Sequence, residues 1–398
     1  MTTRLYYQDA YLKEFDATVT ACLADGDGYL ISLDRTAFYP EGGGQPCDCG
    51  VLIYEENTVA VTDTQEADGT QFPHGEIVHF CRQPIPAGTS VHGKLDWQRR
   101  ITNMREHSGE HIISGIICSS YQVNNVGFHM GKDAVTIDFD GMLSPEQIFA
   151  AQQKANLKIM ENVPVLAEYP DPQTLSSLYY RSKKELEGDV RIITIPGADV
   201  CACCGTHVRT TGEVGPICVT GTEHFKSGVR LTLLIGEKAL ADYAQKTENI
   251  RKISTLLSAR PELTADAVDR LQNAYTQLKT EYTGLRLELL DQKVEAIPAG
   301  TPGAVLFEQE LSPMELRKLA DKLQAKTDFA AVFSGNDTEG YKYVICAAKM
   351  DIAAFGKAFN AALNGRGGGR PPMIQGSLLC TRSQIEKYLE ETCHEYFR

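Results

Sequence analysis

Two pairs of metal-binding residue types constrain this sequence more than any other feature. His107 and His111 lie four residues apart in NMREHSGEHIISG, a stretch whose apolar residues recur at helical spacing. This spacing places both imidazoles on one helix face. Cys203 and His207 lie four apart in VCACCGTHV, where Gly205 and the preceding strand-like RIITIPG indicate a turn. Because thiolate and imidazole are preferred zinc ligands, the four residues together predict one zinc site, which the fold must assemble from distant segments.

The histidine pair also permits other interpretations. HSGEH fits the H-x-x-E-H motif of an inverted zinc peptidase, in which Glu110 would act as the base. That reading needs a third ligand from Glu185 or Glu187, and it leaves Cys203 and His207 without a role. The sequence is not H-E-x-x-H, which excludes the commoner metalloprotease motif. The two halves could also be unrelated features of one chain.

The pattern of the chain changes three times, which predicts an α+β protein in four parts. Residues 1–95 alternate apolar and polar residues around Asp-Gly turns, typical of a β-rich, barrel-like domain with a glycine-rich loop. Residues 96–236 contain both halves of the zinc site in an α+β domain. Residues 237–294 predict a helical hairpin or short coiled coil, broken near Pro261. Residues 295–398 predict a small α/β domain that contains a glycine loop, NGRGGGRPP.

Composition restricts the classes of function. The net charge of −13 argues against indiscriminate coating of nucleic acid and gives no positive support for an RNA partner. No apolar run is long enough to span a membrane, and the N-terminus lacks the pattern of a signal peptide. We therefore expect a cytoplasmic protein, in which most of the 12 cysteines are reduced. Cys201 and Cys204 compete with Cys203 as ligands, and the assignment of Cys203 depends on the Cys-x-x-x-His register.

The two pairs, His107-x-x-x-His111 and Cys203-x-x-x-His207, resemble the editing domain that alanyl- and threonyl-tRNA synthetases share. Three stretches resemble the alanine type: TAFYPEGGGQPCDCG (36–50), CCGTHVRTTGEVG followed by KSGVRL, and NGRGGGRPPMIQGS (364–377). The last resembles the glycine-rich loop of the C-terminal DHHA1-type domain. Order and spacing are similar to the long form of the AlaX family over nearly the whole chain. Since the chain begins almost at the editing domain, we expect it not to be a complete synthetase.

The resemblance implies an aminoacyl-tRNA hydrolase that deacylates tRNA(Ala) mischarged with serine or glycine. It places zinc on His107, His111, Cys203 and His207. It places the substrate-binding loop on Thr36, Glu41, Gly43, Gly44 and Gln45. Glu110 and Cys204 depart from the family pattern, which commonly has small residues between the two histidines and two glycines after the cysteine.

Several roles follow as hypotheses. A serine-selective site needs a group that hydrogen-bonds the hydroxyl, for which Thr36 and Gln45 are candidates. Glu110 is a candidate catalytic or pocket carboxylate, or a solvated helix residue. The expected tRNA-binding residues are Arg99, Arg100, Arg366, Gly367, Gly368 and Arg370. A solvated helix face would explain Arg99 and Arg100 equally well, and a tight structural turn is the alternative for the glycine loop. A homodimer could form through the helical linker and C-terminal domain. The non-enzymatic alternative is a zinc-stabilised tRNA-binding protein.

Overall fold

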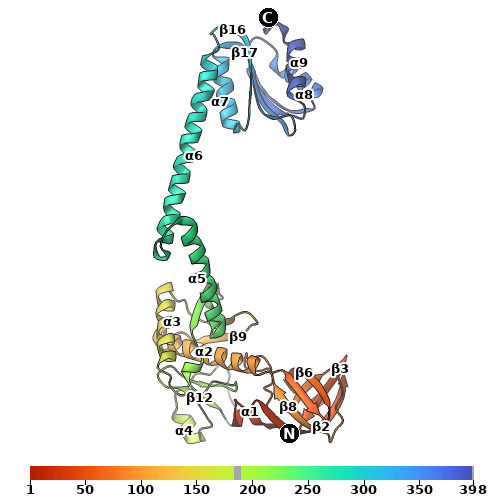
Figure 1. Ribbon diagram of the computed structural model, residues 1–398, viewed down its shortest axis with the longest axis vertical. Coiled ribbons are helices and arrows are strands. Elements are labelled where there is room, and N and C mark those ends of the chain that lie inside the picture. The colour runs from red at the N-terminus through yellow and green to blue at the C-terminus, as the bar shows by residue number, and fades with distance from the viewer. Residues whose placement is uncertain (183–189, 397–398) are drawn as a thin grey trace. The chain divides into compact units, whose positions relative to one another are not determined.

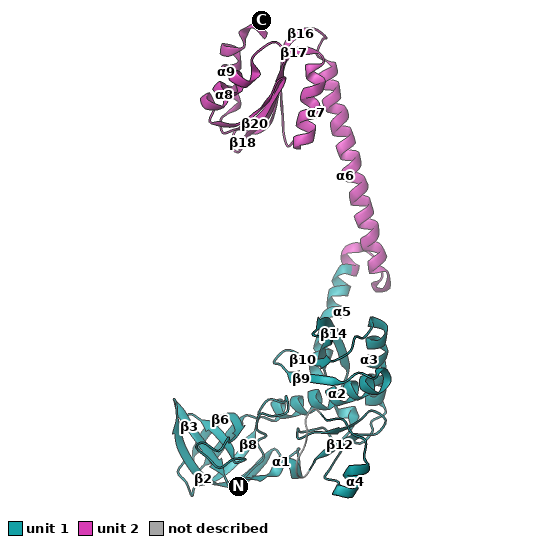
Figure 2. Ribbon diagram, turned by 180° about the vertical axis from the view of Figure 1, so that it is seen from behind, with its two compact units in different colours: residues 1–253 teal, residues 254–398 magenta. Residues whose placement is uncertain are grey.

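The chain folds into two compact units, residues 1–253 and 254–398 (Figures 1 and 2). The computed structural model describes residues 1–182 and 190–396. Mixed helices and sheets confirm the predicted α+β class, and the first sheet is a closed barrel. The four-part domain layout stays a prediction. No described helix is both long enough and apolar enough to cross a bilayer.

The N-terminal barrel has the strand order β2-β3-β7-β6-β5-β8. Its strands are β2 (Glu14–Asp25), β3 (Gly28–Leu33), β5 (Gly50–Tyr54), β6 (Asn57–Glu66), β7 (Ile77–Cys81) and β8 (Ser90–Leu95). Alternation along β2 buries Phe15, Ala17 and Val19, so the predicted two-residue period fills the barrel interior. Outside it lie β1 (Thr3–Arg4), α1 (Leu5–Gln8) and β4 (Arg35–Thr36), with β1 parallel to β4.

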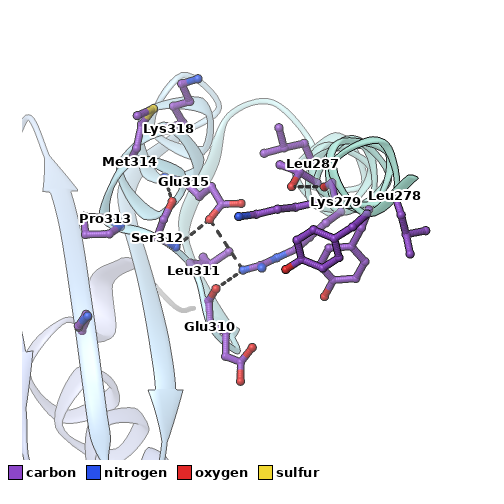
Figure 3. Close-up of a pocket in the computed structure, with 15 residues that line it drawn as sticks. Leu278, Lys279, Leu287, Glu310, Leu311, Ser312, Pro313, Met314, Glu315 and Lys318 are labelled. Carbon is purple, nitrogen blue, oxygen red and sulfur yellow. Dashed lines mark hydrogen bonds and ion pairs between the residues drawn. The ribbon is translucent and has the colours of Figure 1, made fainter. Parts of the chain in front are cut away.

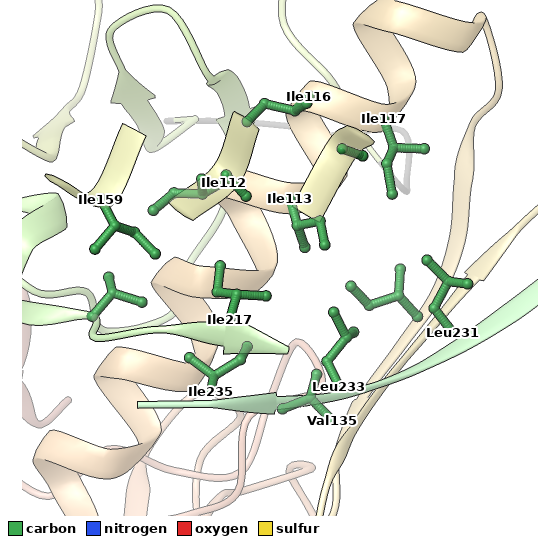
Figure 4. Packing of buried hydrophobic residues seen from close by; sticks show 14 of the residues in the cluster. Ile112, Ile113, Ile116, Ile117, Val135, Ile159, Ile217, Leu231, Leu233 and Ile235 are labelled. Carbon is green, nitrogen blue, oxygen red and sulfur yellow. The ribbon is translucent and has the colours of Figure 1, made fainter. Parts of the chain in front are cut away.

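The middle of the first unit is built around α2 (Trp97–Tyr121), the helix predicted from the apolar spacing. Asp96 caps its N-terminus, and its side chain accepts a hydrogen bond from the Arg99 amide at 3.1 Å. A sheet of order β14-β15-β10-β9 packs beside it, formed by β9 (Asn125–Met130), β10 (Val135–Phe139), β14 (Ile217–Phe225) and β15 (Gly228–Ile235). Isoleucines and leucines of α2 and this sheet form the shared core (Figure 4).

Helix α3 (Pro145–Met160) covers the same core. Ser144 is its N-cap, as predicted, and completes a capping box with Gln147. A second, three-stranded sheet contains β11 (Leu166–Glu168), β12 (Ile192–Ile195) and β13 (Asp199–Ala202) in that order. The short helices of this unit are α4 (Pro172–Ser177) and η1 (Thr211–Glu213). Strand β13 matters for the site because its end leads directly into the cysteine cluster.

The predicted helical region contains α5 (Glu237–Leu257) and α6 (Thr264–Glu295), separated by η2 (Pro261–Leu263). The break therefore falls at Pro261, as predicted, because proline cannot continue the hydrogen bonding of a helix. Most of α5 belongs to the first unit and α6 to the second, so their pairing as a hairpin stays a prediction.

The second unit has a five-stranded sheet of order β16-β17-β18-β20-β19. Its strands are β16 (Thr301–Glu308), β17 (Thr327–Asn336), β18 (Gly340–Ala347), β19 (Gly365–Arg370) and β20 (Met373–Leu378). Its helices are α7 (Pro313–Gln324), α8 (Ile352–Ala362), α9 (Arg382–Thr392) and η3 (His394–Tyr396).

The predicted glycine loop at 364–372 is wrong in part, because residues Gly365–Arg370 form edge strand β19, antiparallel to β20. The glycines permit close approach to β20: a Cβ on Gly367 would lie 2.4 Å from the Gln375 carbonyl oxygen. A run of glycines carries no apolar alternation, so the strand could not be recognised from periodicity.

Candidate metal centre

The four predicted ligands come together between α2 and the turn after β13. One ligand atom from each of His107, His111, Cys203 and His207 lies within 4.8 Å of the others. The three histidines are each at most 6% exposed. The helix supplies two residues from one face, and the turn supplies the other two. The cluster could therefore bind a metal ion, although its assignment to zinc stays a prediction.

Each imidazole of the cluster uses its Nδ1 atom for a hydrogen bond to a neighbouring side chain. The pairs are His107 with Gln45 Oε1 at 2.8 Å, His111 with Asp199 Oδ2 at 2.9 Å, and His207 with Ser108 Oγ at 3.1 Å. This leaves the three Nε2 atoms for the centre of the cluster. Outer partners of this kind fix the ring orientation and tautomer of metal-binding histidines.

The inner atoms fit a metal by their chemistry. The Nε2 atom of His207 is buried and has no hydrogen-bond partner among the described residues. Cys203 Sγ lies 3.3 Å from His107 Nε2. A buried imidazole nitrogen without a partner costs free energy unless something else binds it. One sulfur and three nitrogens also form a donor set that suits a tetrahedral zinc ion.

The charges around the sulfur favour its ligating form. Burial alone would raise the pKa of Cys203, but the neighbouring His107 and His111 rings outweigh it and hold that pKa well below its usual value. Burial lowers the pKa of His207 to about 3, so this ring is neutral at physiological pH. A thiolate and neutral imidazoles are the protonation states that bind metals. Burial would lower the pKa of His111, but Cys203 and Asp199 raise it well above its usual value, so a bound ion would take the place of that proton.

Asp199 links the cluster to the guanidinium group of Arg181. Its two carboxylate oxygens accept bonds from Arg181 Nε and Nη2, both at 2.7 Å, while Oδ2 also contacts His111. Burial would raise the pKa of Asp199, but Arg181 and His111 lower it. Sequence reasoning missed Asp199, Arg181 and Ser108, because none of them belongs to a recognisable ligand spacing.

Glu110 is buried beside the cluster, so the interpretation as a solvated helix residue is wrong. The side chain is 2% exposed, and its Oε1 atom accepts hydrogen bonds from Ser114 at 2.8 Å and Asn125 at 2.5 Å. Its Oε2 atom lies 3.9 Å from His111 Nε2. A carboxylate at this position could contact a substrate, and that role stays a proposal.

The glycine-rich loop at 36–50 reaches the cluster through Gln45, which is fully buried. Its Oε1 atom accepts from His107 and from the Thr206 amide, and its Nε2 atom donates to Thr206 Oγ1 at 2.9 Å. Gly43 and Gly44 have positive φ angles of 60° and 84°. A Cβ on Gly44 would lie 2.6 Å from Phe128, so only glycine allows this close approach.

Two other predicted residues of this loop point elsewhere. The Thr36 hydroxyl is buried, 2.9 Å from His79 Nε2, and accepts from the Phe38 amide at 3.1 Å. Glu41 is exposed and receives a long contact from Gln65 at 3.4 Å. Both side chains therefore have interaction partners within the protein and need no substrate to account for their positions. The assignment of Thr36 and Glu41 to a substrate site stays a prediction.

Two family models match segments of this chain. One, described as tRNA synthetases class II (A), matches residues 4–99. The other, described as the threonyl and alanyl tRNA synthetase second additional domain, matches residues 190–232 and so includes Cys203 and His207.

Relatives are similar over nearly the whole chain. The alanyl-tRNA editing protein AlaX-L of Pyrococcus horikoshii is 28% identical over 97% of this chain and 96% of its own length. An alanyl-tRNA editing protein of Danio rerio is 28% identical over 98% of this chain and 97% of its own. The chain belongs to the AlaX family of alanyl-tRNA editing proteins. The alanine–tRNA ligase of Pyrococcus furiosus is 33% identical over 95% of this chain, which spans 42% of that ligase.

Besides Glu110 on α2, this AlaX-family chain departs from the expected pattern at Cys204, in the turn after β13. Gly205 is the glycine that the site requires, since a Cβ there would lie 2.1 Å from His107 Cε1. Cys204 is exposed and replaces the other expected glycine. Cys201 is buried and forms a second potential metal group with His111 and Asp199. Asp199 is engaged by Arg181, so the group with Cys203 suits a metal better.

The predicted tRNA-binding arginines have different environments. Arg100 is fully buried, paired with Asp48, and bonded to the carbonyls of Ala10 and Ala37, so its prediction as an RNA contact is wrong. It instead connects α2 to the glycine-rich loop through these contacts. Arg99 is exposed, although its Nε donates to the Cys47 carbonyl at 2.8 Å.

The glycine strand of the second unit exposes the remaining predicted RNA contacts. Arg366, Gly367, Gly368 and Arg370 are all exposed on edge strand β19. Arg366 and Arg370 share one face of the strand, because side chains alternate with a period of two. The peptidase alternative needs Glu185 or Glu187, which lie outside the described residues.

Proposed function

We propose that this chain is an aminoacyl-tRNA hydrolase that cleaves the ester bond of tRNA(Ala) mischarged with serine, with glycine as the second candidate. The observation that carries this proposal is the cluster in which three imidazoles are held by Nδ1 partners and face Cys203. Membership of the AlaX family and the match of residues 190–232 support it. This substrate places the reaction where translation occurs, in the cytoplasm.

His107, His111, Cys203 and His207 would hold a zinc ion, the cofactor that this donor set suits. A zinc ion bound there would supply a Lewis acid able to polarise a carbonyl or acidify a water. Gln45, Asp199 and Ser108 keep the three rings oriented. Because four protein ligands usually close a tetrahedral site, groups of the chain itself must contribute to binding and orienting the ester.

The glycine-rich loop would bind the reacting end of the substrate through its backbone. Gly43 is exposed, and no atom lies within 4 Å of where its Cβ would be. Its amide can therefore approach an ester or a terminal ribose closely. Gln45 positions His107 in this proposal, since its Oε1 and Nε2 atoms are both engaged within the protein.

Glu110 would recognise the ammonium group of the aminoacyl ester. Its carboxylate is buried within 4 Å of His111, next to the proposed reaction centre. A buried carboxylate stabilises a cation strongly, because little water screens the pair. Peptidase chemistry is less well supported, since it assigns no role to Cys203 and His207, which share the cluster with both α2 histidines.

The tRNA body would contact the edge strand β19. Arg366 and Arg370 present two cations on one face, and guanidinium groups bind phosphates well. Exchanging both for alanine should raise KM for charged tRNA and leave kcat nearly unchanged. Exposed Arg382, on helix α9 of the same unit, provides a matched alanine control.

Deacylation assays on Ser-tRNA(Ala), Gly-tRNA(Ala) and Ala-tRNA(Ala) test the proposal directly. We expect serine, and more slowly glycine, to be released faster than alanine, together with zinc in the purified protein. Binding of tRNA(Ala) without turnover of any charged form would instead indicate a zinc-stabilised tRNA-binding protein. Release of alanine as fast as serine would exclude an editing function.

A further inference from the structure

Cys49 lines a hollow on the surface of the barrel. The hollow measures about 510 Å³, and Thr62, Lys94 and Asp96 are among the other residues that line it. Cys49 is half-buried, and its thiol donates a hydrogen bond to the Thr62 carbonyl oxygen at 3.2 Å. The groove of about 1020 Å³ between α6 and α7 differs, since the sulfur among its described lining residues is the thioether of Met314 (Figure 3). The barrel hollow therefore presents a thiol, which is a nucleophile when ionised, to small molecules in solvent.

A second thiol, that of Cys47, contacts Cys49. Cys47 is buried, and its thiol donates a hydrogen bond to the Cys49 sulfur. The Cα atoms of residues two apart are separated by at most about 7 Å, near the upper end of the range that a disulfide bridges. Residues 47–49 belong to neither a helix nor a strand, so a slight bend of the backbone at Asp48 suffices. The pair thus consists of one accessible and one buried thiol that can reach each other.

The surroundings of Cys49 favour its thiolate. Its carbonyl oxygen accepts a hydrogen bond at 2.8 Å from the amide of Asp96, the N-cap of α2. Thiol pKa values are lowered at helix N-termini and beside arginine. Here the hydrogen bond from Cys47 and the charge of Arg99 outweigh burial and lower the pKa of Cys49 to about 7. The same hydrogen bond and burial raise the pKa of Cys47, so Cys49 is the nucleophile of the pair.

We propose that Cys47 and Cys49 form a peroxide-sensitive dithiol, which closes to a disulfide and thereby disturbs the glycine-rich loop. The Cys49 thiolate attacks hydrogen peroxide, the O–O bond breaks, and hydroxide leaves a sulfenic acid on Cys49. The Cys47 thiol then attacks this sulfur, the S–O bond breaks, and water leaves as the disulfide forms. The hydroxide takes up the proton that Cys49 lost on ionisation. Two electrons have passed from the thiols to the peroxide, which becomes two molecules of water.

The disulfide acts on the loop through Asp48, which lies between the two cysteines. The buried Asp48 carboxylate accepts a hydrogen bond from the Tyr39 amide at 2.6 Å and pairs with Arg100 of α2. A disulfide across one intervening residue bends the backbone at Asp48 and so disturbs both contacts. The same loop carries Gln45, which holds His107. Oxidation therefore lowers the activity of the candidate metal centre, a consequence that rests on the proposed function.

Mass spectrometry of the intact 398-residue chain tests the dithiol. With hydrogen peroxide at pH 7, we expect the segment with residues 47 and 49 to lose two hydrogen atoms, and dithiothreitol to restore them. Cys47→Ser should instead leave a sulfenic acid on Cys49 that dimedone traps. Cys380, a half-buried thiol of the second unit whose pKa is raised by burial, is the control, and Cys49 should react at least about tenfold faster. Equal rates, or a disulfide from Cys49 to a cysteine other than Cys47, would overturn the proposal.

Hydrogen exchange and deacylation test the effect on the loop. Because the Tyr39 amide is bonded to Asp48, it should exchange at least about tenfold faster in the oxidised chain, whether or not the chain is a hydrolase. Unchanged exchange at Tyr39 would overturn the effect on the loop, even if no form of the chain deacylates and the proposed function fails.

Deacylation of Ser-tRNA(Ala) should fall by about tenfold or more in the peroxide-treated wild type, because small displacements near a reaction centre are costly. Dithiothreitol should restore the rate, and Cys49→Ser should lose much less of its own rate. An equal loss in wild type and Cys49→Ser would assign the sensitivity to another thiol, such as Cys203, and would contradict control of the site by the dithiol.

Discussion

The Nδ1 atom of His111 lies 2.9 Å from Oδ2 of Asp199, a carboxylate that accepts two further hydrogen bonds from Arg181. The carboxylate fixes the ring so that Nε2 faces the cluster, and its negative charge makes the ring a stronger ligand. Asp199 therefore acts on the metal centre without contacting the centre itself.

Asp199→Asn should weaken metal binding by about 10- to 100-fold, the range found when an outer partner of a ligating histidine is lost. Competition with a zinc chelator measures this change. Asp171→Asn, at the exposed N-cap of α4, is a control for loss of a carboxylate elsewhere in the unit. Unchanged affinity in Asp199→Asn would mean that Asp199 does not support His111 as a ligand.

Cys203→Ala should abolish stoichiometric zinc and reduce deacylation of Ser-tRNA(Ala) by at least about 100-fold, because a three-histidine cluster loses its only anionic donor. The adjacent Cys204→Ala is the matched control, since its thiol is exposed and lies outside the cluster. Elemental analysis of both variants checks the assignment. If Cys204→Ala or Cys201→Ala lost the metal instead, the ligand register would be wrong.

The sequence predicted most of this architecture because its signals are local. Helical spacing placed α2, Asp-Gly turns and alternation indicated the barrel strands, and Pro261 marked the break before α6. The two halves of the cluster were also predictable, because the two ligands of each half lie only four residues apart in the sequence. The outer partners Gln45, Asp199 and Ser108 were not, since each depends on which distant side chain meets an imidazole.

The wrong predictions also concern features that depend on tertiary contacts or that leave no pattern in the sequence. Arg100 has the sequence context of an exposed helix residue, but Asp48 and two carbonyls satisfy its guanidinium in the interior. Glu110 was ambiguous for the same reason, because only the tertiary fold supplies Ser114 and Asn125. The strand at Gly365–Arg370 has the sequence pattern of a loop, because glycine has no side chain that could show the alternation of a strand.

Glu110→Gln should raise KM for Ser-tRNA(Ala) by about tenfold or more, if the carboxylate binds the substrate ammonium. Glutamine keeps an oxygen that can accept the bonds from Ser114 and Asn125, so the variant removes the charge and preserves the local packing. Steady-state kinetics separate this effect from a loss of kcat, which would indicate a role in proton transfer. The neighbouring Glu106→Gln tests another buried carboxylate of α2, which pairs with Lys238 instead. An equal effect of both exchanges would argue against substrate recognition by Glu110.

His79 should make the stability of the barrel depend on pH. Burial lowers the pKa of this fully buried ring to about 4 in the folded chain, compared with 6.5 when it is exposed. Between these values the unfolded chain binds a proton that the folded chain does not, so stability falls as the pH decreases from 6.5 towards 4. From pH 7 to pH 5, the contribution of His79 should decrease by roughly 2 kcal/mol. Because other groups also titrate, the measurement is the difference in unfolding free energy between wild type and His79→Gln at each pH. That difference should shift in favour of His79→Gln at pH 5, and a pH-independent difference would show that His79 does not titrate in this range.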